Sequence, residues 1–250
     1  MVAESLMNLA CVGARPLAVV NCLNFGNPEH PEVMWQLSEA VDGLAEACVA
    51  FGVPVVGGNV SLYNESAGTD IDPTPVIGLL GMVDDLVRRP PGATLVDGHR
   101  LVLLGPSDVS LSGSLWGATR DARGGELAPL DLELHQRVVD FVCDLVVSGR
   151  VDGVHDVSAG GLGVAVAEMV SRSGVGAHLA RIEDHRALFG EGPSRVVLVV
   201  DPECLSEVLA AAEAARVPTT RIGLATGEQL IVLLGKSVDS RGRRFIANKI

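Results

Sequence analysis

Polar side chains follow a run of valines at residues 53–63 (VPVVGGNVSLY). Gly57 and Gly58 carry no side chain, so another group can approach the backbone closely there. Asn59 and Ser61 are two residues apart, and in an extended chain such residues point to the same side. The pattern predicts a buried strand that ends in a small ligand-binding polar pair. From this stretch alone, a bulge or turn with hydrogen-bonding residues is the preferred interpretation.

A second apolar run, residues 16–21 (PLAVVN), also ends in an amide, that of Asn21. Because the ends of neighbouring strands meet at one rim of a sheet, we expect Asn21 to converge there with Gly58, Asn59 and Ser61.

Residues 155–162 (HDVSAGGL) form a third polar stretch. A strand would deliver Asp156 and Ser158 to one side, and the two glycines would open a helix. A carboxylate there can hold Mg²⁺ while the helix N-terminus faces a phosphate. The alternative is an Asp or Ser N-cap with a tight glycine turn. His155 stands beside valines, which favours a half-buried histidine over a general base.

Two further charged or polar pairs follow helical spacing. Glu4 and Asn8 lie at i and i+4 of an N-terminal helix, so that one ion could touch both, although an exposed polar pair has the same spacing. Glu191 and Arg195 read as an ordinary i,i+4 charged pair. No Ser-His-Asp order, metal-type histidine spacing or nucleophilic cysteine context is present in the sequence.

The elements that must position these residues alternate between strand and helix in two blocks. In the first block we expect helices at 2–13 and 31–52 and strands at 16–21, 53–56 and 74–83. In the second we expect strands at 100–104, 153–157, 195–200, 220–222 and 229–233 and helices at 130–147, 162–171 and 202–215. This alternation indicates an α/β to α+β architecture. RRPPG at 88–92 is typical of a linker. The predicted domains are therefore 1–88 and 98–235, with an irregular tail at 236–250.

Composition excludes several functions. The chain has 250 residues, 48% of them hydrophobic, and a net charge of −12, which argues against a nucleic-acid-binding protein. None of the five cysteines is in a CxxC spacing, and no apolar run reaches the ~18 residues of a membrane span, so we expect a cytoplasmic protein with no membrane association. The only lysines are Lys236 and Lys249, which rules out a P-loop, so phosphates would be bound by backbone N–H groups, arginines or Mg²⁺.

Five ordered blocks resemble a known family. They are CLNFGNPEHPEVMWQ (22–36), VPVVGGNVSLYN (53–64), PTPVIGLLG (73–81), HDVSAGGL (155–162) and LFGEGPSRVVLVV (188–200). Together they resemble the large subunit of phosphoribosylformylglycinamidine synthase, the glutamine-dependent amidotransferase of purine biosynthesis, from about residue 2 to about residue 234. The resemblance implies an ATP-binding domain of the aminoimidazole ribonucleotide synthetase-like type, followed by its α+β C-terminal domain.

The family enzyme is two to three times longer and has two similar halves, so the resemblance implies that this chain is the C-terminal half only. Because the first helix begins almost at Met1, we expect the opening strands of that half to be missing. The family's catalytic histidine lies in the first half, so no catalytic residue is expected in this fragment. The implied reaction uses ATP and Mg²⁺ to convert formylglycinamide ribonucleotide and ammonia to the amidine.

The resemblance also assigns roles to single residues. Asn21, where the family often has Asp, and Gly58 would contact ATP, Asn59 would ligate Mg²⁺, and Ser61 would contact formylglycinamide ribonucleotide. A second set matches the structural nucleotide site of long-chain relatives: Glu4, Asn8 and Asp156 at the metal and Ser158 at an ADP. The implied protein partners are the missing N-terminal half, a glutaminase subunit and a small bridging subunit.

Two other functions stay open from the sequence. One is a non-catalytic nucleotide-binding structural module of the same complex, which the Glu4, Asn8, Asp156 and Ser158 set favours. The other is a different ATP-using relative such as aminoimidazole ribonucleotide synthetase, whose chains differ at the GGNVS and LNFG blocks.

Overall fold

The structure is a computed structural model that describes residues 1–122 and 124–235 and the backbone of 244–247. The chain divides into two compact units. The first comprises Met1–Leu9 and Ala14–Asp84, and the second comprises Ala10–Gly13 and Asp85–Ile250. No helix of the described residues is long and apolar enough to cross a membrane. The predicted mixture of α/β and α+β structure is confirmed.

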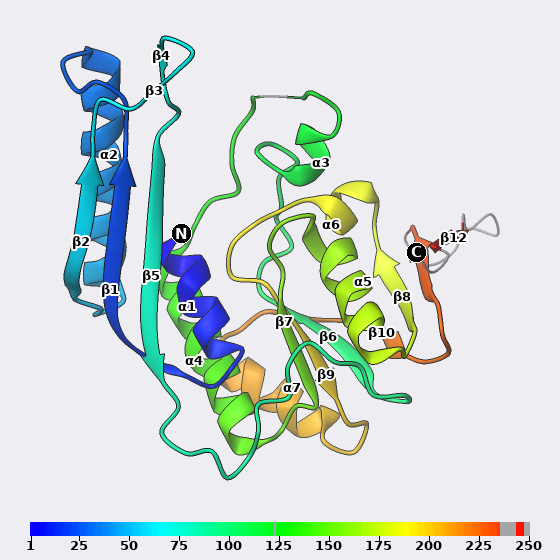
Figure 1. The fold of residues 1–250 in the computed structure, drawn as a ribbon. Coiled ribbons are helices and arrows are strands. Elements are labelled where there is room, and N and C mark those ends of the chain that lie inside the picture. Colours follow the sequence, from blue (N-terminus) through cyan, green and yellow to red (C-terminus); the bar gives the residue numbers. More distant parts are fainter. Residues whose placement is uncertain (123, 236–243, 248–250) are drawn as a thin grey trace. The chain divides into compact units, whose positions relative to one another are not determined.

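The first unit is built on a three-stranded sheet with the order β2-β1-β5 (Figure 1). Its elements are α1 (Val2–Ala10), β1 (Arg15–Asn24), α2 (Pro31–Ala50), β2 (Val55–Ser61), β5 (Thr74–Met82) and the short hairpin of β3 (Glu65–Ser66) and β4 (Thr69–Asp70). β2 runs parallel to β1 and β5 runs antiparallel to it. The connection from β1 to β2 is therefore a crossover through α2, as parallel neighbours require.

Helix α2 covers one face of this sheet. Pro31 at its start and Gly52 just after its end, with φ +64°, set its limits. Its Val33 packs with Leu23 and Phe25 to form the core of the unit. On the uncovered face the side chains of Val76 and Leu80 are 52% and 63% exposed.

The expectation of a buried strand at 53–56 that ends at GGNVS is wrong. β2 runs through these residues to Ser61, and every residue from Val55 to Val60 is exposed. The physical reason is its position at the edge of a small sheet, where only one neighbour shields it.

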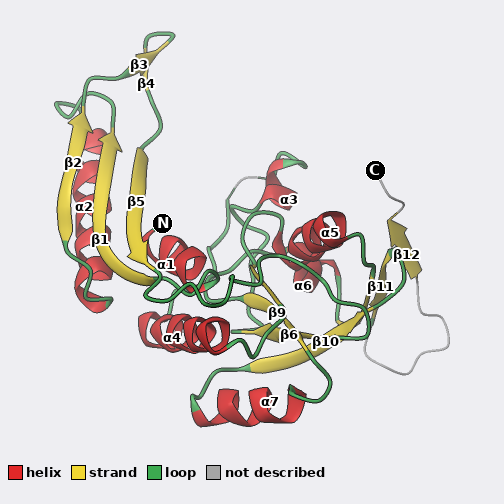
Figure 2. Cartoon of the chain, turned by 60° about the horizontal axis from the view of Figure 1, so that its bottom comes forward, coloured by secondary structure: helices red, strands yellow, loops and turns green. Residues whose placement is uncertain are grey.

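The second unit is built on a seven-stranded sheet with the order β12-β11-β8-β10-β6-β9-β7. Its strands are β6 (Arg100–Leu104), β7 (Gly153–Asp156), β8 (Ala177–Ile182), β9 (Val196–Val200), β10 (Thr219–Ala225), β11 (Leu230–Leu234) and β12 (Arg244–Ala247). Its helices are α3 (Leu115–Ala118), α4 (Leu132–Ser148), α5 (Gly161–Ser173), α6 (His185–Phe189) and α7 (Leu205–Ala214). Helices α5 and α6 lie on one face and α4 and α7 on the other (Figure 2). The central strands β6 and β9 are almost entirely buried between these layers.

Part of the predicted irregular tail is a strand. The backbone of Arg244–Ala247 forms β12, which pairs antiparallel with β11. The cause is the free edge that β11 offers, because its other side is already paired with β8. Residues 236–243 and 248–250 of the predicted tail lie outside the described residues.

Candidate functional site

The first candidate cluster lies where β1 and β2 are side by side. Their parallel register pairs Asn21 with Gly58, Cys22 with Asn59 and Asn24 with Ser61. The structure therefore places Asn21 next to the GGNVS stretch, but within the ladder rather than at a shared rim.

The two faces of β2 divide this cluster. A Cβ added to Gly58 would lie 2.3 Å from Asn21 Oδ1, so the Asn21 side chain covers the Gly58 backbone. Asn59 Nδ2 lies 3.9 Å from Cys22 Sγ on the opposite face, and Ser61 follows Asn59 by the strand period. Asn59 and Ser61 thus share a face, as the spacing predicted, and Asn21 lies on the other face.

Asn64 is a further member of this cluster, and the sequence interpretation did not single it out. Ser61 Oγ donates to Asn64 Oδ1 at 3.1 Å, and Asn64 Nδ2 donates to the carbonyl oxygens of Phe25 and Ser61, each at 3.0 Å. These contacts fix the end of β2 to the end of β1 and hold the Ser61 hydroxyl in place. The spacing Ser-x-x-Asn after the glycines was the available signal.

Asp70 anchors the loop that follows β1. Its Oδ1 accepts the backbone N–H of Asn27 at 2.7 Å, and its Oδ2 lies 2.7 Å from His30 Nδ1. The Asn27 N–H bond first, and the bond to His30 second, lower the pKa of Asp70, and the same pairing raises the pKa of His30. Gly26 has no room for a side chain, because an added Cβ would meet the Asp70 carboxylate. The Asp70 carboxylate therefore holds the loop from Gly26 to His30 in place.

The second candidate cluster, in the other unit, centres on Asp156 at the end of β7. His155 Nδ1 lies 3.2 Å from Asp156 Oδ1, and His155 Nε2 lies 3.0 Å from Glu168 Oε2. The imidazole contact is the main cause that lowers the pKa of Asp156, and it also raises the pKa of His155. The His155 side chain is 14% exposed, so the half-buried histidine is confirmed. The Asp156 carboxylate thus contacts His155, and a carboxylate oxygen is a type of ligand that Mg²⁺ prefers.

The glycine pair after Asp156 begins α5 in an unexpected way. Its N-cap is Gly160, with φ +82° and no side-chain cap, so neither Asp156 nor Ser158 caps this helix. Glu191 Oε1 accepts the N–H groups of Gly160 at 2.8 Å and Leu115 at 2.7 Å. Glu191 therefore joins the starts of α5 and α3.

The expected Glu191–Arg195 pair does not form within the described residues. Arg195 is 3% exposed, its guanidinium donates to the Gly190 carbonyl at 3.4 Å, and burial lowers its pKa to about 10. The i,i+4 rule applies to helices, whereas residues 190–195 are not helical.

The set expected around a structural nucleotide is divided between the units. Glu4 and Asn8 are exposed on α1 in the first unit, and Asp156 and Ser158 belong to the second. Their grouping stays a prediction. Within the described ranges, no three or more His, Cys, Asp or Glu side chains form a group that could hold a metal ion.

Two family matches, one for each part of this fold, define the class of protein. Residues 1–83 match the family described as AIR synthase related protein, N-terminal domain, and residues 96–236 match AIR synthase related protein, C-terminal domain. The chain belongs to the AIR synthase related family.

Within that class, curated relatives share one name. The chain is 46% identical over 206 residues to phosphoribosylformylglycinamidine synthase subunit PurL of Renibacterium salmoninarum, a match that covers 79% of this chain and 27% of the relative. It is 41% identical over 254 residues to subunit PurL of Moorella thermoacetica, covering 98% of this chain and 35% of the relative. The chain thus spans about a third of the length of these relatives.

Solved structures share the fold. The Thermotoga maritima PurL structure complexed with FGAR has a TM-score of 0.70 at 21% identity, covering 93% of this chain and 39% of that one. The hydrogenase maturation protein HypE also has a TM-score of 0.70, at 16% identity, covering 99% of this chain and 81% of that one. At these identities the similarity concerns the fold alone, and the same fold occurs in proteins with different names.

Proposed function

We propose that this chain is the C-terminal half of the synthetase subunit of phosphoribosylformylglycinamidine synthase. The observation that carries the proposal is the 41–46% identity to PurL subunits along most of the chain. The reaction would be an ATP-dependent carbon–nitrogen ligation in the cytoplasm. ATP phosphorylates the amide oxygen of formylglycinamide ribonucleotide, and ammonia released from glutamine then displaces the phosphate to give the amidine.

In this proposal β1 and β2 supply half of the active site. Asn21 and Gly58 contact ATP, Asn59 ligates Mg²⁺ and Ser61 contacts the ribonucleotide. The donor at Asn59 fits this role, because its side chain is exposed on an edge strand and amide oxygens suit a hard cation. Mg²⁺ would supply charge compensation during phosphoryl transfer, and its other ligands would come from the nucleotide and from the missing N-terminal half.

The chain's own residues position these groups. Asn64 holds the Ser61 hydroxyl, and the Asp70 anchor fixes the loop that leaves β1. The catalytic histidine would be supplied by the N-terminal half, and ammonia by a glutaminase subunit docked with a small bridging subunit. We therefore expect the isolated chain to have no turnover.

Reconstitution tests the proposal. The full chain would be mixed with a separately expressed N-terminal half of a PurL relative, the glutaminase and the bridging subunit, and amidine formation would be followed with ATP and glutamine. We expect activity only in the complete mixture, with Asn59→Ala and Ser61→Ala each lowering it about tenfold or more. Ser38→Ala, an exposed serine on α2, is the matched control. Turnover by the chain alone, or full activity of both site variants, would overturn the assignment.

A second candidate, a nucleotide-binding module without chemistry, is favoured by the place of the Asp156 carboxylate at the end of β7, shortly before α5 begins. It would hold ADP and Mg²⁺ through Asp156 and Ser158, together with Glu4 and Asn8. Calorimetric titration of the chain with Mg-ADP tests it, with Asp156→Ala as the variant and the exposed Asp140→Ala as the control. Binding that only Asp156→Ala abolishes supports the module, and no binding by the folded chain rejects it.

A further inference from the structure

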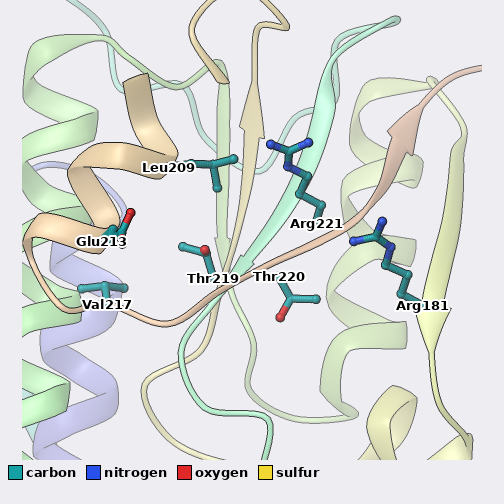
Figure 3. Close-up of a pocket in the computed structure, with 7 residues that line it drawn as sticks. All are labelled: Arg181, Leu209, Glu213, Val217, Thr219, Thr220 and Arg221. Atoms are coloured by element: carbon teal, nitrogen blue, oxygen red, sulfur yellow. The ribbon is translucent and has the colours of Figure 1, made fainter. Parts of the chain in front are cut away.

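We propose that a pocket in the second unit, separate from both clusters above, binds a phosphate monoester through Arg181 and Arg221. The pocket has a volume of about 540 Å³ and lies between β10, the end of β8 and α7. Arg181 and Arg221 lie on one side of it, and Leu209, Glu213 and Val217 lie on the other (Figure 3).

The two arginines lie on neighbouring strands. β10 and β8 pair antiparallel, with Gly223 opposite Leu179 and Leu224 opposite His178. The paired residues end at Gly223 and Leu179, so Arg221 and Arg181 lie just beyond the paired segment, and both line the pocket. Neither guanidinium has an ion-pair partner within 4.0 Å in the described part of the chain. In a chain with a net charge of −12, two exposed arginines that line one pocket form a local concentration of positive charge that a bound anion would stabilise.

Irregular backbone lies at both arginines. Between Leu179 and Ile182, β8 has one residue more than its partner β11, so that Ala180 and Arg181 are exposed in succession. Arg181 adopts φ +63°, a left-handed conformation that costs free energy for a residue with a side chain. β10 has a similar register shift against β6 between Arg221 and Gly223. Bulges re-aim side chains and are frequent beside functional sites.

The chemistry of the lining selects the ligand. Two guanidinium forks match the oxygens of a phosphate, and together they balance a dianion. Glu213 and the C-terminal end of α7 repel an anion, so the phosphate belongs at the β8 and β10 side. The organic part of the ligand then extends toward Leu209 and Val217, which offer an apolar wall. This polarity favours a phosphate monoester with an apolar or flat group over inorganic phosphate.

The test is titration of the full chain with phenyl phosphate and with inorganic phosphate, followed by amide chemical shifts of Thr219 and Thr220 and by calorimetry. We expect phenyl phosphate to bind more tightly than inorganic phosphate. Arg221→Gln and Arg181→Asn, the latter chosen because Asn tolerates φ > 0, should each weaken binding about tenfold or more. Glu213→Gln should strengthen it, because the repelling charge is gone.

Controls separate a specific site from a general charge effect. Arg186→Gln removes an exposed arginine from the same unit outside the pocket, and it should leave binding unchanged. Arg221→Lys keeps the positive charge but loses the guanidinium fork, so this variant should bind phenyl phosphate more weakly than the unaltered chain. Because lysine is a mild replacement at an exposed position, a loss of binding in this variant is not a result of unfolding. Equal losses in Arg186→Gln and Arg221→Gln, or benzoate binding as tightly as phenyl phosphate, would overturn the proposal.

Discussion

Gly58 offers a direct test of how β1 and β2 fit together. In Gly58→Ala the new methyl group would lie 2.3 Å from Asn21 Oδ1 and 2.6 Å from the Asn21 carbonyl oxygen. Overpacking of this kind costs about 1–3 kcal/mol. Gly57 is the matched control, because a Cβ added there meets nothing within 4 Å and its φ is not positive. Gly57→Ala should stabilise by about 0.4–1 kcal/mol, since alanine restricts the unfolded chain. The two variants should therefore differ in unfolding free energy by about 2 kcal/mol.

Urea unfolding measures this difference. The chain has two tryptophans, and Trp35 on α2 reports on the first unit once Trp116→Phe silences the second. Asn21→Ala in the Gly58→Ala background should restore only part of the lost stability, because the backbone oxygen remains in the way. Equal unfolding free energies for Gly57→Ala and Gly58→Ala would refute the packing described for this strand pair.

Two contacts away from these strands give further predictions. Glu191→Gln weakens two charge-assisted hydrogen bonds, so it should lower the free energy of unfolding by about 1–3 kcal/mol and speed amide exchange at Gly160. Glu203→Gln, at an exposed position, should do neither. Slow amide exchange at Gly160 in Glu191→Gln would contradict this prediction. For the His30–Asp70 pair, the contribution of His30 to stability is present below its unfolded pKa and is lost as pH rises through its raised folded pKa. The contribution of Asp70 is present above its unfolded pKa and is lost as pH falls through its lowered folded pKa. The pair therefore stabilises the loop most at pH values between the unfolded pKa of Asp70 and the unfolded pKa of His30. In an NMR titration Asp70→Asn should lower the pKa of His30, and an unchanged value would show that the pair does not form.

Much of the fold follows from sequence periodicity. The strand expected at 100–104 is found as Arg100–Leu104, and the long helix expected from Pro31 begins there. β8 was missed because its bulge at Ala180 and Arg181 breaks the alternation that marks a strand. The β11–β12 pairing was missed because a short edge strand depends on a partner that is distant in sequence.

The sequence predicted which residues of the candidate site lie near one another. It did not predict on which face of the sheet each side chain lies. The nearness of Asn21 to Gly58 follows from two strands of one βαβ unit, which the alternating pattern indicates. Which face each side chain occupies depends on the register between the strands, and a shift of one residue reverses every side chain. The role of Glu191 could not be found from i,i+4 spacing, because its partners Leu115 and Gly160 are brought to it by the tertiary fold.

The division of the candidate residues between the two faces of β2 limits how the ligands of the proposed reaction can approach them. The glycines were expected to admit a nucleotide, but the space over Gly58 is taken by the Asn21 side chain, and only Gly57 is open. A ligand that touches Asn59 and Ser61 lies on one face, while a contact with Asn21 requires approach from the other face or around the free edge of β2. If ATP and the ribonucleotide meet at this edge, Asn21→Ala should lower affinity for ATP without changing that for the ribonucleotide, and Ser61→Ala should do the reverse. Loss of both affinities in Asn21→Ala would instead mean that Asn21 acts by holding the strand pair together.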